Sequence, residues 1–333
     1  MKIKLYLGVV IACILGSFFA IGLVRTATFT FDWVQKQIQP IYFVRSEPAL
    51  GGSGPNEDLH SDFGADTNSQ NNIYLKLNQN LDFPKVSAKA VLVADLDTKQ
   101  IIYQKASEAT FPIASLSKLM TAVMSLETID QEKTVIVQQR DVNTYGRQGN
   151  LVAGEKILIS DLLYPLLLES SNDAAEVLAN FNNRNLFLQF MNRKATILEM
   201  ANTKFNDPSG LSPYNVSTVT DLFKLVQFIA QKRPELLDIT LLKKYETDNH
   251  TWFNHSHFKN DKNYLGGKNG YIVEAKQTLI SVFDLPLEKE ATRRIAIILL
   301  MSDSSEKDTR NIILYLLKNI YYGEFLDKTE KEE

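Results

Sequence analysis

Strand-like runs lie near both ends of the folded part of this chain, and helical patterns fill the interval between them. Two β-branched, apolar runs, Ala88–Asp95 and Gln100–Tyr103, are separated by a short turn and predict a hairpin. Two more strand-like runs, Gln277–Phe283 and Arg294–Met301, come late in the chain. Strands from both regions can share one sheet, so we predict an α+β fold. Its antiparallel sheet is covered by helices, and a mostly helical subdomain is inserted.

Helical patterns account for the interval and for the end of the chain. The first begins near Ser115 and runs to about Ile129, and its apolar positions spread around the helix, which predicts a buried central helix. A closing amphipathic helix is predicted over Thr309–Tyr321. The remaining helices are predicted over four ranges, Ser160–Leu168, Asp173–Asn180, Asn185–Glu199 and Thr220–Gln231.

Composition and charge narrow the classes of function. The chain has 333 residues, of which 44% are hydrophobic and 23% charged, as expected for a globular protein with a substantial core. A net charge of -3 gives no reason to expect a nucleic-acid partner. The single cysteine, Cys13, excludes an intramolecular disulfide, so the compartment has to be inferred from the N-terminus.

The N-terminal segment has the character of a membrane span. About twenty residues, Leu5–Val24, carry no charge, which is long enough to cross a bilayer. Two lysines precede this run, and the excess of positive charge predicts a cytoplasmic N-terminus with the rest of the chain outside. We therefore predict a transmembrane anchor or signal over residues 1–25. A cleaved signal peptide is an alternative, although Phe18 is bulky for a cleavage site, and lipidation of Cys13 is a third.

Three further regions follow this anchor or signal. Residues 26–82 are predicted to be a juxtamembrane segment and a flexible polar linker, because residues 46–75 are rich in Gly, Ser, Asn and Asp and cannot bury enough apolar surface to fold. The folded domain is predicted over residues 83–323. Residues 324–333 form a charged tail.

A Ser-x-x-Lys pair opens the first predicted helix. Ser115 and Lys118 are three residues apart, so on a helix their side chains would project from the same face. A serine hydroxyl needs a base within hydrogen-bond reach before it is a useful nucleophile. A lysine serves as that base only when burial or a nearby positive charge lowers its pKa. The pair alone is common on helix surfaces, so its meaning depends on two later segments.

Each of these two segments also has a simple structural interpretation. Ser170-Ser171-Asn172 lies between two predicted helices, where residues of these types often cap a helix. Lys268-Asn269-Gly270 precedes a strand-like run and contains Asn-Gly, a strong turn signal. A glycine in a strand can also let a ligand approach the backbone closely.

Taken in order, Ser-x-x-Lys, Ser-x-Asn and Lys-x-Gly resemble the motifs of the penicillin-recognising serine enzymes. The closest likeness is to the low-molecular-mass D-alanyl-D-alanine carboxypeptidases, and the residues around the motifs contribute to it. These are Ala114–Thr121, Ser170–Ala175 and Met191–Ala195, together with Asn206–Leu211, which is similar to the family's Asn-Pro-x-Gly-Leu. The resemblance covers about residues 84–322 and implies the β-lactamase/penicillin-binding transpeptidase-like fold.

The resemblance implies a serine-type D-Ala-D-Ala carboxypeptidase that removes the terminal D-alanine from peptidoglycan stem pentapeptides. Ser115 would form the acyl-enzyme, Lys118 would take its proton, and Ser170 would relay a proton to the leaving group. β-Lactam antibiotics would be covalent inhibitors, and the chemistry would need no metal or other cofactor. Substrate-binding roles are implied for Asn172, Lys268, Asn269, Gly270 and Tyr271.

The same resemblance places the protein in the bacterial cell envelope. The segment Leu5–Val24 would hold it in the cytoplasmic membrane, with the catalytic domain outside the cytoplasm. Three histidines, His250, His255 and His257, lie close together in the sequence. We interpret them as surface or cleft-rim residues, because no cysteine or paired carboxylate lies at metal-ligand spacing nearby.

The main departure from the family's pattern is at Asn269, and a smaller one is Glu199, which stands where glycine is usual. Asn269 stands where a hydroxyl residue is usual, and although an amide can donate to a substrate carboxylate, it is longer and placed differently. Two alternatives therefore stay open: a D,D-endopeptidase of the same family, and a catalytically weakened domain that binds the wall or β-lactams. A serine β-lactamase is a third, although the Glu-x-x-Leu-Asn segment of class A enzymes is not found.

Overall fold

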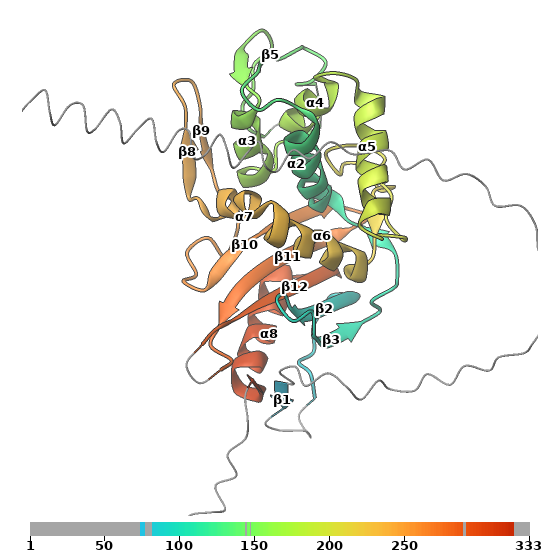
Figure 1. Cartoon of the computed structure of the whole chain (residues 1–333), viewed down its shortest axis with the longest axis vertical. Coiled ribbons are helices and arrows are strands. Elements are labelled where there is room, and N and C mark those ends of the chain that lie inside the picture. The colour runs from blue at the N-terminus through green and yellow to red at the C-terminus, as the bar shows by residue number, and fades with distance from the viewer. Residues whose placement is uncertain (1–73, 77–81, 144, 147, 289–290, 323–333) are drawn as a thin grey trace, which may run out of the picture. The chain divides into compact units, whose positions relative to one another are not determined.

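The computed structural model describes residues 74–76, 82–143, 145–146, 148–288 and 291–322 (Figure 1). The predicted anchor or signal over residues 1–25, the tail over 324–333 and most of the linker lie outside these ranges. Within the described ranges, the helices lack the combination of length and apolar character that crossing a membrane requires.

A five-stranded antiparallel sheet forms the lower half of the molecule in Figure 1, in the order β10-β11-β12-β2-β3. Ala90 in β2 lies opposite Leu300 in β12, so early and late strands share one sheet, and this prediction is confirmed. The turn interpretation of Lys268-Asn269-Gly270 is wrong, because these residues lie within β10. The strands are β2 (Ala90–Asp95), β3 (Ile101–Lys105), β10 (Tyr264–Ile272), β11 (Lys276–Leu285) and β12 (Arg293–Ser302).

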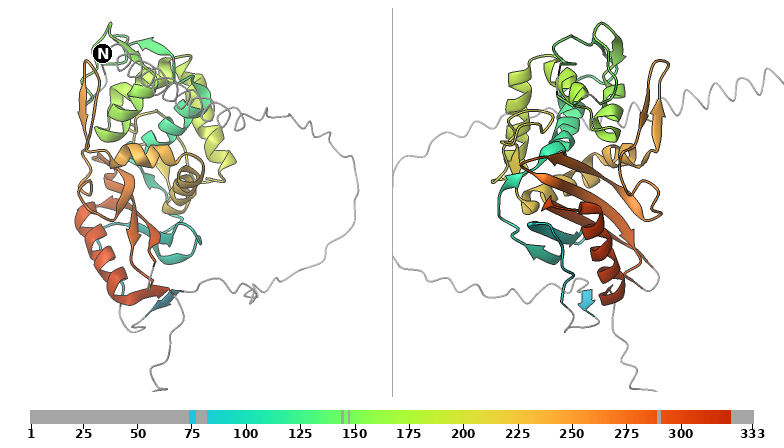
Figure 2. Two further views of the ribbon diagram at one scale, coloured as in Figure 1. Left: turned by 60° about the vertical axis from the view of Figure 1, so that its left-hand side comes forward. Right: turned by 180° about the vertical axis from the view of Figure 1, so that it is seen from behind.

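Both faces of strands β2, β11 and β12 are buried, and the period of two along these strands separates two cores. In β12, Ile298 faces the core shared with the helical region, whereas Ile297 faces the core beneath the last helix. Helix α6 (Val219–Lys232) covers the first face and α8 (Ser305–Asn319) the second, as the front and back views show (Figures 1 and 2). The sheet is thus fixed between two layers of helices.

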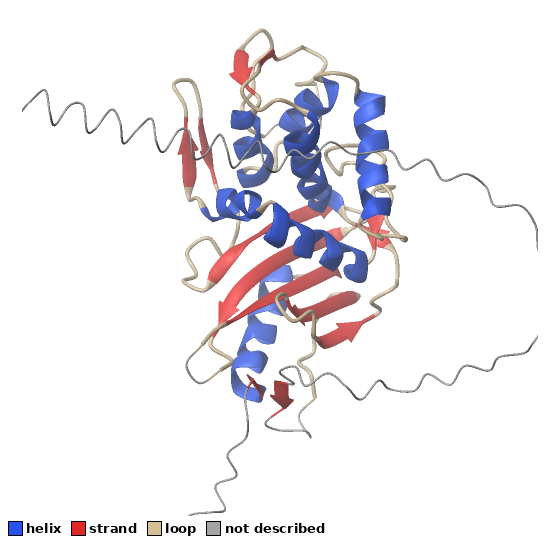
Figure 3. Cartoon of the chain, in the orientation of Figure 1, coloured by secondary structure: helices blue, strands red, loops and turns tan. Residues whose placement is uncertain are grey.

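The helical region stands above the sheet in Figure 3 and is organised around one buried helix. Helix α2 (Ser117–Thr128) follows the 3-10 helix η1 (Ala114–Leu116), and Met120 and Val123 within it are fully buried. The prediction of a central helix is confirmed. It is surrounded by α3 (Leu163–Leu168), α4 (Asn172–Asn180), α5 (Arg184–Ile197) and α7 (Pro234–Leu241), and the 3-10 helix η2 (Ser160–Leu162) leads into α3.

Short two-stranded ladders complete the fold. Strand β1 (Tyr74–Lys76) pairs with β13 (Ile320–Tyr322), so pairing begins before residue 83, within the segment predicted to be a linker. The last helix ends at Asn319 rather than Tyr321, because the chain continues into β13. The other pairs are β4 (Phe111–Pro112) with β7 (Val216–Ser217), β5 (Thr134–Ile136) with β6 (Lys156–Leu158), and β8 (Lys244–Glu246) with β9 (Thr251–Phe253).

Candidate active site

The start of α2 brings Ser115 and Lys118 together, as their spacing predicts. Ser115 lies in η1 and Lys118 in the first turn of α2, and Lys118 Nζ lies 3.0 Å from Ser115 Oγ. The Lys118 side chain is fully buried, whereas Ser115 is half-buried and lines a cavity of about 500 Å³. A serine hydroxyl open to a ligand therefore lies beside an amine that is shielded from water.

Lys118 has two further partners, and their chemistry determines where its protons lie. Its Nζ is 2.7 Å from Asn172 Oδ1 and 2.5 Å from the carbonyl oxygen of Ser209. The Asn172 amide is oriented by its own Nδ2, which donates to the Tyr145 carbonyl at 2.8 Å. Both oxygens can only accept, so a neutral amine would donate its two hydrogens to them. Its lone pair would then be left for the hydroxyl of Ser115.

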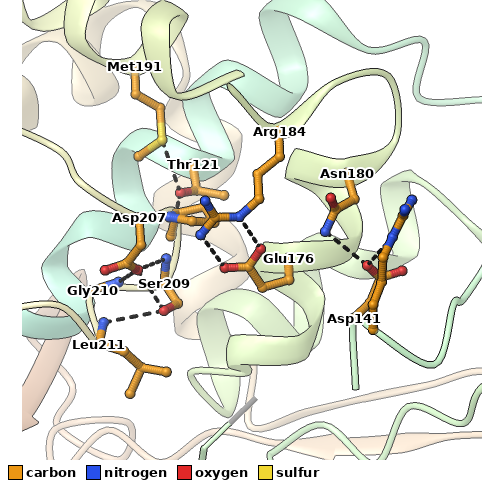
Figure 4. Close-up of polar contacts among 12 residues, drawn as sticks. Thr121, Asp141, Glu176, Asn180, Arg184, Met191, Asp207, Ser209, Gly210 and Leu211 are labelled. Carbon is orange, nitrogen blue, oxygen red and sulfur yellow. Dashed lines mark hydrogen bonds and ion pairs between the residues drawn. The ribbon is translucent and has the colours of Figure 1, made fainter. Parts of the chain in front are cut away.

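Burial favours the neutral form of this amine. It holds the pKa of Lys118 well below the ordinary lysine value, and the charge of Lys268 lowers that pKa further. Asp207 and Glu176 oppose the shift and raise the pKa of Lys118. Glu176 is itself paired with Arg184, whose Nε and Nη2 donate to it at 2.6 and 2.9 Å (Figure 4). Burial also lowers the pKa of Lys268 to about 7.

The junction between α3 and α4 supplies the second motif. Ser171 is the N-cap of α4 and accepts a hydrogen bond from the Ala174 amide at 3.1 Å, so the cap interpretation is correct for this serine. Ser170 has a positive φ of 62° and lines the cavity, where Lys268 Nζ lies 3.0 Å from its Oγ. Asn172 begins α4 and also lines the cavity.

Strand β10 supplies the third motif at the edge of the sheet. Lys268 is 3% exposed, and its Nζ also donates to the Asn269 carbonyl at 2.8 Å. A Cβ built on Gly270 would lie 2.7 Å from the backbone nitrogen of Ser115, so only glycine lets the strand approach this closely. Asn269, Gly270 and Tyr271 all line the cavity. The three motifs, far apart in the sequence, therefore border one space.

Asp207 was not among the predicted site residues, although it lies in the segment Asn206–Leu211 that contributes to the family resemblance. The Asp207 carboxylate accepts hydrogen bonds from the backbone nitrogens of Ser209, Gly210 and Ser212 at 2.7, 2.6 and 2.7 Å, and Figure 4 shows the first two beside it. Thr121 of α2 donates to the next carbonyl of this loop, that of Pro208, at 2.6 Å. The loop thus holds the Ser209 carbonyl against Lys118. An Asp followed by Pro and Gly was the available signal.

Glu169 is a second residue that sequence reasoning missed. It is 7% exposed and lines the cavity, and its two oxygens accept from the backbone nitrogens of Gly149 at 3.0 Å and Phe253 at 2.9 Å. Its position immediately before Ser170 was the only signal in the sequence.

The three histidines do not gather at one point. His255 lines the cavity, His250 Nε2 lies 2.8 Å from Glu155 Oε2, and the exposed His257 lies 3.4 Å from a Glu306 oxygen. Throughout the described ranges, no group of three His, Cys, Asp or Glu side chains is placed to hold a metal ion.

The sequence of this chain is similar to those of known D-alanyl-D-alanine peptidases. A family model described as D-alanyl-D-alanine carboxypeptidase matches residues 77–299. The D-alanyl-D-alanine endopeptidase of Escherichia coli K12 is 36% identical over 159 residues, which are 46% of this chain and 50% of that protein. The D-alanyl-D-alanine carboxypeptidase DacF of Bacillus subtilis 168 is 26% identical over 67% of this chain and 60% of that protein. This chain thus spans about half the length of the endopeptidase and somewhat more of DacF.

Solved structures give the same answer for the fold. The D-alanyl-D-alanine carboxypeptidase of Mycobacterium tuberculosis H37Rv superposes with a TM-score of 0.65 at 25% identity, covering 72% of this chain and 95% of that one. Penicillin-binding protein D2 from Listeria monocytogenes, in a cefotaxime-bound form, gives 0.63 at 26% identity and covers 71% of this chain and 99% of that one. The predicted fold class is confirmed.

Proposed function

This chain belongs to the D-alanyl-D-alanine carboxypeptidase family, and we propose that it is a serine peptidase acting on the terminal D-Ala-D-Ala bond of peptidoglycan stem peptides. One observation carries the proposal: the buried Lys118 amine lies 3.0 Å from the hydroxyl of Ser115 at the edge of a cavity. An activated serine beside an open space is what acyl transfer requires.

The reaction proceeds in two steps. Ser115 Oγ attacks the carbonyl carbon of the scissile bond while its proton passes to the neutral Lys118 amine. The C–N bond breaks as the proton held by Lys118 is relayed through the Ser170 hydroxyl to the departing D-alanine nitrogen, and an ester on Ser115 is left. Lys268, 3.0 Å from Ser170 Oγ, supplies the positive charge beside this relay. Water then hydrolyses the ester and restores the serine hydroxyl.

The remaining site residues bind and orient the substrate. Asn172 holds a substrate amide and orients Lys118, and Lys268 with Asn269 binds the terminal carboxylate. The backbone N–H groups of Ser115 and Tyr271 stabilise the oxyanion, an interaction worth about 3 to 4 kcal/mol per donor in serine hydrolases. The stem peptide lies along the edge of β10, where Gly270 leaves room for it to pair as an added strand.

A D,D-endopeptidase activity is the second candidate. The relatives at 34–36% identity from Escherichia coli, Pseudomonas aeruginosa and Haemophilus influenzae are named D-alanyl-D-alanine endopeptidases. Asn269 lines the cavity in place of the family's hydroxyl residue, which favours a substrate without a free terminal carboxylate. Both candidate activities form the same acyl-enzyme on Ser115 and differ in the leaving group, which is D-alanine for a carboxypeptidase and a cross-linked peptide for an endopeptidase.

We also propose that the protein works in the cell envelope and that Leu5–Val24 anchors it in the cytoplasmic membrane. The uncharged run and the lysines before it support this placement. Fractionation of cells that express the full chain, compared with a chain lacking residues 1–25, tests it. Recovery of the full chain in the soluble fraction after alkaline extraction would contradict the anchor.

Labelling with a fluorescent penicillin tests the function. Ser160 is a matched control for Ser115, because it also lies in a 3-10 helix that leads into a buried helix, but it does not line the cavity. We expect durable labelling of the wild type and of Ser160→Ala, and none of Ser115→Ala. Equal labelling of Ser115→Ala would exclude the proposed nucleophile.

The fate of label and substrate separates the alternatives. Release of D-alanine from a model pentapeptide identifies a carboxypeptidase, whereas cleavage of a cross-linked dimer without that release identifies an endopeptidase. Rapid loss of the label identifies a β-lactamase. Retained binding to isolated cell wall without any label identifies a binding domain whose catalysis is lost.

A further inference from the structure

We propose that Glu169 is a positioning residue for the acylation step: by fixing a loop at the cavity rim, it holds Asn172 in the orientation that Lys118 needs to act as a base. This inference rests on the proposed function. The loop, called the rim loop below, is defined by Tyr145, Gly146, Gln148 and Gly149, all but the last of which line the cavity.

The Glu169 carboxylate links three segments. It lies at the end of α3, its Oε2 accepts from Gly149 of the rim loop at 3.0 Å, and its Oε1 accepts from Phe253 of β9 at 2.9 Å. Hydrogen bonds from backbone N–H groups to a buried carboxylate are among the stronger ones in proteins. Because its two oxygens accept from two different segments, the Glu169 carboxylate holds the rim loop and β9 to the end of α3.

Gly149 is the point at which the rim loop is fixed. Its carbonyl accepts from Trp252 Nε1 at 2.7 Å, so Glu169 and the β8–β9 hairpin hold its two backbone groups. Its φ is +90°, and a Cβ placed on it would lie 2.7 Å from Ser171 Oγ. The loop therefore packs tightly against the segment that carries Ser170 and Asn172.

The rim loop in turn orients the Asn172 amide. Gln148 accepts a hydrogen bond from Ser171 Oγ at 2.6 Å, and Tyr145 accepts from Asn172 Nδ2 at 2.8 Å. The second bond leaves Asn172 Oδ1 facing Lys118 at 2.7 Å. If the Tyr145 carbonyl moved, the amide could turn and present its NH₂ group to Lys118, which would occupy the lone pair needed for the proton of Ser115.

The test replaces Glu169 with a residue of the same shape. Glu169→Gln keeps one acceptor oxygen but places an NH₂ group against one of the two backbone N–H donors. Asp308→Asn is the matched control, because Asp308 is 4% exposed, accepts from the Ser87 and Ala88 backbone nitrogens at 2.9 and 3.0 Å, and lies on α8 outside the cavity lining. Both changes disturb a buried carboxylate, but only one touches the rim loop.

We expect Glu169→Gln to slow acylation of Ser115 by a fluorescent penicillin about tenfold or more, which is part of the roughly 10²–10⁴-fold that a general base contributes. Asp308→Asn should acylate at the wild-type rate when both are measured at the same interval below their melting temperatures. A wild-type rate for Glu169→Gln, or an equal loss in Asp308→Asn, would overturn the proposal.

A double-mutant cycle identifies the route. If Glu169 acts through Asn172, adding Glu169→Gln to Asn172→Ala should cause little further loss, because the orientation it protects no longer matters. Losses that multiply would overturn the positioning role. If Glu169→Gln does not fold, Glu169→Asp, which keeps the charge but withdraws both oxygens by one methylene, takes its place in the cycle.

Hydrogen exchange separates this inference from the proposed function. The Gly149 and Phe253 amides should exchange faster in Glu169→Gln than in the wild type, whether or not the protein is acylated. Unchanged exchange would show that Glu169 does not hold the rim loop to β9. A wild type that no penicillin labels would remove the proposed function, and the exchange result would still decide whether Glu169 holds the rim loop.

Discussion

Gly270 packs against the backbone nitrogen of Ser115 so closely that a Cβ added to this glycine would lie 2.7 Å from that nitrogen and 2.7 Å from Thr278 Oγ1. This contact joins the sheet edge to the start of α2. We predict that Gly270→Ala displaces the Ser115 N–H, a proposed oxyanion donor, and lowers the acylation rate about 10²-fold. Stopped-flow labelling with penicillin, with thermal unfolding to confirm folding, measures it. If a folded Gly270→Ala protein were acylated at the wild-type rate, glycine at position 270 would not be needed to keep the Ser115 N–H in place.

The charge of Lys268 lowers the pKa of Lys118, and this gives a prediction for the pH profile. In Lys268→Gln that charge is gone, so the pKa of Lys118 rises. The fall of the acylation rate at low pH, here called the acid limb, therefore moves to higher pH. Lys276→Gln, a change on the neighbouring strand β11, is the control and should leave the limb in place. A limb that stays at the same pH in Lys268→Gln would show that Lys118 does not govern it.

The buried position of Lys268 also makes stability depend on pH. Burial lowers its folded-state pKa to about 7, below the unfolded value of about 10.4. Between these values the unfolded state binds more protons, so the contribution of Lys268 to stability improves as pH rises. Relative to the wild type, Lys268→Met should gain most stability below pH 7 and lose this advantage towards pH 10. Urea unfolding at pH 6, 8 and 10 measures the difference, and a constant difference would contradict the shift.

Asp207 links the stability of its loop to the protonation of Lys118. An asparagine there would give up part of the hydrogen bonding to three backbone N–H groups, so we expect a loss of about 1–3 kcal/mol in the free energy of unfolding. Asp207 also raises the pKa of Lys118, so the acid limb of acylation should move to lower pH in Asp207→Asn.

Asp221→Asn is the matched control for this change. Asp221 is a buried carboxylate that accepts from the Asn202 backbone nitrogen at 2.8 Å and from Thr203 Oγ1 at 2.9 Å, outside the cavity lining. Its replacement should lower the free energy of unfolding without moving the acid limb. A parallel shift of the limb in both variants would mean that the Asp207 charge has no specific effect on Lys118.

Local spacing was enough to predict part of the site. Ser115 and Lys118 are three residues apart, so helical geometry alone brings them together. The order of the motifs then identified Ser170, Asn172 and Lys268. The burial of Lys118 and Lys268 was not predictable, because it arises from the packing of α2 within the helical region and of β10 against η1.

Three features of the site had little or no signal in the sequence. Strand β10 was open to interpretation as a turn because it contains Asn269-Gly270, a strong turn signal, and only pairing with β11 reveals the strand. Glu169 and Asp207 accept from backbone N–H groups, which every residue except proline has, so the side-chain sequence does not identify their partners. The positive φ of Ser170 also has no signal in the sequence, because glycine is the residue that usually indicates a positive φ and this position holds a serine.

Helix α7 covers one stretch of β10, where Thr240 Oγ1 accepts from the Gly267 backbone nitrogen at 3.0 Å. Within the described ranges, β10 is an outermost strand of its sheet, and such strands are ready templates for unwanted association with other proteins. Capping by Thr240 confines the stretch available for pairing to the residues from Asn269 onward that border the cavity. We expect a short peptide to pair there, whereas a long foreign strand would meet α7. One end of the β10 edge is thus covered by α7, which disfavours aggregation there, and the other end borders the cavity.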